Sequence, residues 1–196
     1  MLGLLKPTDP SWVDAARSDL RGLLSDHAHC ELKAAQNALA LVGRFGGEHP
    51  ELTEPLLQLA EEETDHFRQV EAKLRATGGA LSYPESDPYV AALRKASNAL
   101  DQADRAPRLL DRLMVAALIE ARSCERFKLL AEHLDDEPLS TFYADLMASE
   151  AKHYRLFRDL GCQAFGEAAV RDRFQKLADL EAEIASELPL GPTVHG

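Results

Sequence analysis

Apolar residues recur every three to four positions along most of the chain, which is the spacing of amphipathic helices. This spacing predicts four long helices, over about residues 12–42, 51–77, 108–134 and 139–160. It also predicts a short helix near 89–99 and a fifth amphipathic stretch over about 167–188. The Pro- and Gly-containing tail that follows is expected to fray. Alternation typical of strands is nearly absent, so the pattern predicts an all-α protein.

Glycine and proline divide these helices into two pairs. Gly43, Gly46, Gly47 and Pro50 separate the first two helices, and the segment 135–138 (Asp-Asp-Glu-Pro) separates the third from the fourth. Short connections make neighbouring helices antiparallel, whereas about thirty residues join the two pairs. We therefore predict a ferritin-like four-helix bundle, made of two helical hairpins joined by a long crossover, with extra short and C-terminal helices. Residues 1–196 are expected to form a single domain, with the core bundle at about 12–160.

A Glu-x-x-His pattern occurs twice, once in the second and once in the fourth predicted helix. A single glutamate lies about thirty residues upstream of each copy, on the preceding helix. On a helix, residues three apart share a face, so each copy presents a carboxylate and an imidazole together. Four carboxylates and two histidines in this helical order are the ligand set of carboxylate-bridged di-iron proteins. The six candidate ligands are Glu31, Glu63, His66, Glu120, Glu150 and His153.

These four glutamates lie on apolar helix stripes that carry neither lysine nor arginine to compensate them. A buried carboxylate without a partner costs several kcal/mol, so a multivalent cation is the simplest way to offset four of them. Oxygen-rich ligation with two imidazoles favours iron or manganese over zinc or copper. Two iron ions that react with O2 are therefore the predicted cofactors, with Glu63 and Glu150 as the bridging candidates. Manganese in one position stays an alternative.

Three nearby residues are further candidates for a place at the metal site. Glu125 is the rival of Glu120 on the third helix, but at 100° per residue it lies about 140° from the Glu120 stripe. Glu120 is therefore preferred. His27 and His29 flank Glu31, and we expect structural or exposed positions for both rather than a role beside the metal.

The charge and cysteine content narrow the class of protein. A net charge of −11 argues against broad non-specific binding to nucleic acid, which depends on neutralising phosphates. A local basic strip, with Arg94, Lys95, Arg105, Arg108 and Arg112, nevertheless precedes and enters the third long helix. Three widely spaced cysteines without a C-x-x-C pair fit a reducing cytoplasm. No apolar run is long enough to span a membrane.

Three segments resemble the tRNA-(2-methylthio-N6-isopentenyladenosine) hydroxylases, a family of ferritin-like di-iron proteins. They are residues 26–36 (DHAHCELKAAQ), 117–127 (ALIEARSCERF), and Phe142-Tyr143 followed by SEAKH at 149–153. The resemblance extends from about residue 12 to 160. It implies hydroxylation of the isopentenyl side chain of a modified adenosine in tRNA, with O2, two iron ions and an external electron donor such as a reductase or ferredoxin. It also implies the same six ligands.

Two other classes remain as alternatives to a tRNA hydroxylase. A ferritin- or rubrerythrin-like protein would oxidise iron or reduce peroxide, although the C-x-x-C module usual in rubrerythrins is absent. A helical interaction module without metal would leave the carboxylates on the apolar stripes uncompensated, and it fits the pattern worst.

For a tRNA hydroxylase, the basic strip is the expected contact with tRNA.

Overall fold

The computed structural model describes residues 2–84, 86–100 and 108–195, and it divides into two compact units. Unit 1 comprises Met1–Asp14, Asp87–Leu190 and His195–Gly196, and unit 2 comprises Ala15–Ser86 and Gly191–Val194. Within the described residues every regular element is helical, as predicted. The predicted single domain over 1–196 stays a prediction.

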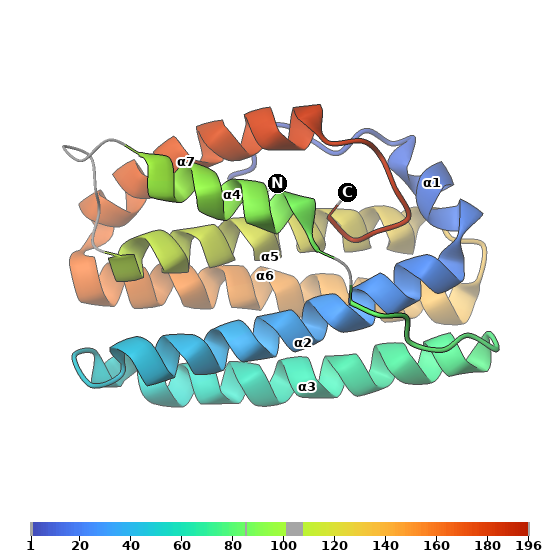
Figure 1. The fold of residues 1–196 in the computed structure, drawn as a ribbon, viewed down its shortest axis with the longest axis horizontal. Coiled ribbons are helices and arrows are strands. Elements are labelled where there is room, and N and C mark those ends of the chain that lie inside the picture. The colour runs from blue at the N-terminus through green and yellow to red at the C-terminus, as the bar shows by residue number, and fades with distance from the viewer. Residues whose placement is uncertain (1, 85, 101–107, 196) are drawn as a thin grey trace. The chain divides into compact units, whose positions relative to one another are not determined.

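Unit 2 is a helical hairpin. Helices α2 (Leu20–Phe45) and α3 (Thr53–Ala76) run antiparallel, joined by a turn that ends in the short 3-10 helix η1 (Pro50–Leu52) (Figure 1). Leu23, Leu24 and Leu41 of α2 are fully buried or nearly so. These positions follow the helical period, and burying their side chains stabilises the fold.

The predicted helix over 12–42 is two helices, α1 (Trp12–Ser18) and α2. The break lies at Asp19, whose backbone has φ −143° and ψ 76° and whose side chain accepts a hydrogen bond from the Gly22 N–H at 2.9 Å. A Cβ at Gly22 would collide with that carboxylate. An N-cap therefore overrides the continuous apolar spacing that predicted one helix.

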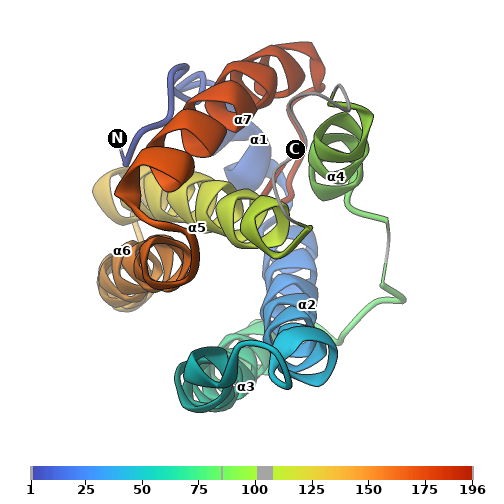
Figure 2. The ribbon, with the colours of Figure 1, turned by 90° about the vertical axis from the view of Figure 1, so that its left-hand side faces the viewer.

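Unit 1 contains a second hairpin, of α5 (Arg108–His133) and α6 (Glu137–Phe165), together with α4 (Pro88–Ala99) and α7 (Glu167–Glu187). Helix α6 begins at the N-cap Asp136, which accepts a hydrogen bond from the Leu139 N–H at 2.8 Å. Gly166 has φ +84°, a conformation that suits glycine, and turns the chain from α6 into α7. Helix α7 packs on α5 and α6, with α4 beside it (Figure 2).

A buried polar network joins α5 to the neighbouring segments of unit 1. The Arg122 guanidinium, 1 % exposed, lies 2.6 Å from Glu181 and 2.5 Å from Glu125, and it also donates to the Thr8 hydroxyl. Burial lowers the pKa of Arg122, but the carboxylates of Glu181 and Glu125 outweigh that effect and raise it. Tyr89 donates to Glu181 at 3.0 Å, and burial raises its pKa. The Arg122 guanidinium is thus shared by two carboxylates, to which Thr8 and Tyr89 donate further hydrogen bonds.

The expected fraying of the C-terminal tail is wrong for its last described residues. Val194 and His195 are 1 % and 5 % exposed. In unit 1, His195 Nδ1 lies 2.7 Å from Asp87, its Nε2 lies 3.0 Å from the Ser123 hydroxyl, and its ring stacks on Tyr89 at 5.3 Å. These contacts hold the chain end, and composition alone does not reveal them.

None of the helices in residues 2–84, 86–100 and 108–195 has the length and apolar character required to cross a membrane.

Candidate metal centre

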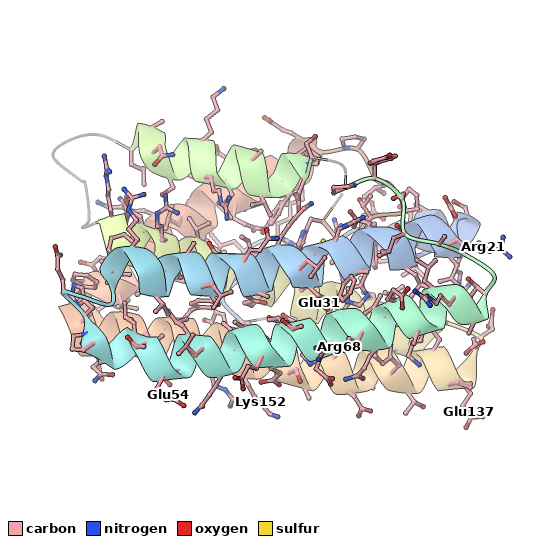
Figure 3. The ribbon with its side chains drawn as sticks, turned by 60° about the horizontal axis from the view of Figure 1, so that its bottom comes forward. Arg21, Glu31, Glu54, Arg68, Glu137 and Lys152 are labelled. Atoms are coloured by element: carbon pink, nitrogen blue, oxygen red, sulfur yellow. The ribbon has the colours of Figure 1, made fainter. Side chains whose placement is uncertain are left out.

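Unit 2 carries three of the predicted ligands on the facing sides of its hairpin. Glu31 comes from α2, and Glu63 and His66 come from α3. Each offers a ligand atom within 4.8 Å of the others, and all three side chains are buried. His66 Nδ1 lies 3.0 Å from Glu63 Oε2, as expected for positions three apart on one helix. Figure 3 shows Glu31 in the body of α2, whereas Arg21 extends outward at one end of that helix.

Unit 1 carries the other three ligands in the same order. Glu120 lies on α5, and Glu150 and His153 lie on α6. Their ligand atoms also lie within 4.8 Å of one another, and all three side chains are buried. His153 Nδ1 is 3.9 Å from Glu150 Oε2, a looser approach than that of His66 to Glu63. Each hairpin therefore forms a triad of two carboxylates and one imidazole.

The preference for Glu120 over Glu125 agrees with the contacts of the two side chains. Glu125 accepts hydrogen bonds from the Thr8 backbone and hydroxyl at 3.2 and 2.7 Å, and it pairs with Arg122. Its charge is therefore compensated by protein groups. Glu120 belongs instead to the cluster with Glu150 and His153. The choice of Glu120 as the metal ligand of α5 stays a prediction, and these contacts are consistent with it.

His27 is the residue at this site that sequence reasoning undervalued. It is fully buried, and its Nε2 lies 2.7 Å from Glu31 Oε1, one helical turn away. The spacing of four residues between His27 and Glu31 was the available signal. His29 behaves as expected, because it lies near the surface and contacts the Ser82 carbonyl at 2.9 Å.

The cysteines and tyrosines near the triads have ordinary packing positions. Burial raises the pKa of Cys124 to about 11, and a thiol that stays protonated is a poor nucleophile and ligand. Tyr143 is fully buried and its ring lies 5.4 Å from Phe127 and 5.5 Å from Phe142. Cys30, Cys124 and Cys162 form no disulfide.

Most of the predicted basic strip is exposed on unit 1. Arg94 and Lys95 lie on α4, and Arg108 and Arg112 lie in the first turns of α5. Arg105 lies outside the described residues. The four described side chains are accessible to a partner.

The donor set of each triad fits a hard or borderline metal ion. Carboxylate oxygens with one imidazole suit iron or manganese, and buried carboxylates on apolar helix faces need a counter-charge. Two hairpins with a glutamate on one helix and Glu-x-x-His on the other define the class of ferritin-like carboxylate proteins. A metal-binding role is consistent with both triads.

Comparison with known proteins agrees with this class. A family model described as tRNA-(MS[2]IO[6]A)-hydroxylase (MiaE) matches residues 2–196, and the chain belongs to this family. A tRNA 2-(methylsulfanyl)-N(6)-isopentenyladenosine(37) hydroxylase of Pseudomonas putida is 38 % identical over 178 residues, covering 91 % of this chain and 84 % of the relative. The protein of the same name from Salmonella typhimurium is 30 % identical over 226 residues, covering 91 % and 82 %.

A solved structure is also similar over almost the whole chain. It is described as protein 43 with aldehyde deformylating oxygenase activity from Synechococcus. The TM-score is 0.88 at 39 % identity, covering 98 % of this chain and 95 % of that one. The predicted all-α, ferritin-like fold class and the predicted family are confirmed, and the chain is an enzyme of the hydroxylase type.

Proposed function

We propose that this enzyme hydroxylates the isopentenyl side chain of 2-methylthio-N6-isopentenyladenosine in tRNA. The observation that carries the proposal is the pair of buried triads, in a chain that matches the tRNA hydroxylase family over residues 2–196. The substrate is the one named for the relatives from Pseudomonas putida and Salmonella typhimurium.

The proposed cofactor is a pair of iron ions, and the proposed ligands are the residues of the two triads. Glu31, Glu63 and His66 would supply one half of the ligands, and Glu120, Glu150 and His153 the other half. Bound iron would supply the oxidising power that an unactivated C–H bond requires, with O2 as co-substrate and electrons from a reductase or ferredoxin.

The chain's own residues would then orient the ligand side chains and shield the reacting groups from water. The imidazoles of His66 and His153 each sit beside the glutamate of their own motif, which limits the orientations that either side chain adopts. The leucine, alanine and aromatic side chains that fill the hairpins exclude water from the reacting groups. An apolar prenyl group is compatible with such surroundings.

The exposed cations of α4 and α5 are the proposed tRNA contact. Replacing Arg94, Lys95, Arg108 and Arg112 together by glutamate should weaken tRNA binding and flatten its dependence on salt, because fewer counterions are released. Iron content should not change. Unaltered tRNA affinity in this variant would remove the basic strip from the proposal.

The decisive experiment is nucleoside mass spectrometry of isopentenylated tRNA after incubation with iron-loaded enzyme, O2 and a reductant. A gain of one oxygen atom on the prenylated adenosine is expected. If two irons bind but the nucleoside does not change, while iron(II) or peroxide is consumed rapidly, an iron-handling role replaces the hydroxylase.

The likeness to the Synechococcus protein favours one further candidate, removal of the formyl group from an aldehyde. The same iron-loaded enzyme, O2 and reductant, incubated with an aldehyde in place of tRNA, distinguishes the two. Formate release together with an unchanged nucleoside in the tRNA assay would establish deformylation in place of hydroxylation.

A further inference from the structure

The contact between His27 and Glu31 involves two charged or polar side chains inside the apolar core of one hairpin. His27 is 0 % exposed and Glu31 is 4 % exposed. An ionised carboxylate only accepts hydrogen bonds, so the imidazole Nε2–H donates to Glu31 Oε1 across the 2.7 Å separation. Bonds of this kind, with an ionised acceptor, are among the stronger ones in proteins.

This bond restricts the orientation of the Glu31 carboxylate. A glutamate has three rotatable side-chain bonds, and ordering them costs rotamer entropy whenever the side chain takes one fixed position. The bond to His27 engages Oε1, one of the two oxygens of the carboxylate that the triad uses. His27 itself is not a member of the triad with Glu63 and His66.

The other hairpin has no imidazole at the matching position. Counting back four residues from Glu120 leads to Ala116, a buried methyl side chain. A donor on the preceding turn is therefore built into the α2 half only, although the two halves offer the same three ligands.

From this asymmetry we propose that His27 is a positioning residue that orients Glu31, so that the two metal positions of this enzyme differ in affinity. The inference rests on the proposed di-iron function and deepens it. Hydrogen bonds from neighbouring groups to ligating carboxylates typically change metal affinity about 10- to 100-fold.

A pair of amide substitutions separates this hydrogen bond from simple packing. The amide nitrogen of His27→Gln reaches about as far along the side chain as Nε2, whereas that of His27→Asn stops near the place of Nδ1. His29→Asn is the matched control, because His29 contacts the Ser82 carbonyl rather than Glu31. Each protein is titrated with iron(II) under anaerobic conditions, and metal stoichiometry and affinity are measured without turnover.

We expect two iron sites in the wild type, in His27→Gln and in His29→Asn. His27→Asn should weaken one of the two sites about 10- to 100-fold and leave the other unchanged. Unchanged affinity in His27→Asn overturns the proposal, as does equal weakening in the Asn and Gln variants, which would indicate packing alone.

Thermal unfolding of the metal-free proteins confirms that the variants fold. If the wild type itself binds fewer than two iron ions, the di-iron proposal fails first and takes this inference with it. If the wild type binds two iron ions and His27→Asn binds both with the same affinity, only the positioning role of His27 is overturned.

Discussion

The two hairpins carry the same set of three ligands, but different elements pack against their helices. In unit 2, α2 pairs with α3, and Gln36, five residues after Glu31, is exposed. In unit 1, α5 packs on α6 and also on α7 and α4, and Glu125, five residues after Glu120, is buried. The ligand-bearing faces of α2 and α5 are thus alike, whereas the other faces of these two helices differ in burial and in residue chemistry.

This difference explains why a polar residue five positions after the upstream glutamate needs protein partners in one half and none in the other. A polar residue at the position of Gln36 needs no partner, because water solvates it. A carboxylate at the position of Glu125 requires Arg122 and Thr8. The tertiary neighbours, rather than residue type, therefore separate a candidate ligand from a structural ion pair.

The largest expected effect is on iron content, in a comparison of alanine variants of the two α5 glutamates. Glu120→Ala should lower the iron content from two ions per chain to about one or fewer, because its triad loses a carboxylate. Glu125→Ala should retain both ions, although it loses stability with its contact to Arg122. Metal analysis after anaerobic loading measures both variants. Equal iron content in the two would refute the assignment of Glu120.

Substitution of Arg122 in unit 1 should lower stability far more than substitution of Lys33, the residue at the matching position of unit 2. Arg122→Met leaves Glu181 and Glu125 buried without their cation, a change that costs about 3–5 kcal/mol of unfolding free energy. Lys33 lies two residues after Glu31, as Arg122 follows Glu120. Lys33→Met should change stability by about 0.5 kcal/mol or less.

Urea denaturation of the two metal-free variants tests this contrast. A cost for Arg122→Met no greater than for Lys33→Met would mean that the network contributes nothing net to unit 1.

The repeated pattern of the sequence predicted the shared part of this comparison and missed much of what differs. Both Glu-x-x-His motifs and both upstream glutamates follow from helical spacing, which is local information. The break at Asp19 depends on one side chain that caps a helix. The contacts of His195 and Glu181 join segments far apart in the chain, and no periodicity in a single sequence records such pairs.

A smaller effect is expected in cysteine reactivity. Burial raises the pKa of Cys124 to about 11, so only about 0.1 % of this thiol is ionised at pH 8. Alkylation by iodoacetamide should be slow in the folded protein and accelerate about tenfold per pH unit up to that value. Peptide mass spectrometry in buffer and in urea gives both rates. Rapid labelling of Cys124 in buffer at pH 8 would contradict the burial argument.

The smallest effect concerns another feature that the two hairpins share, an aspartate at the N-cap of one helix. Asp19 caps α2 through the Gly22 N–H, and Asp136 caps α6 through the Leu139 N–H, at 2.9 and 2.8 Å. Asp19→Ala and Asp136→Ala should each cost about 1 kcal/mol of unfolding free energy, since each leaves one N–H of a first turn to water. Asp65, an exposed residue inside α3, provides the control Asp65→Ala, for which about 0.5 kcal/mol or less is expected. If a cap variant costs no more than this control, the corresponding N-cap contributes nothing measurable, and the equivalence of the two hairpins would be limited to their metal-binding faces.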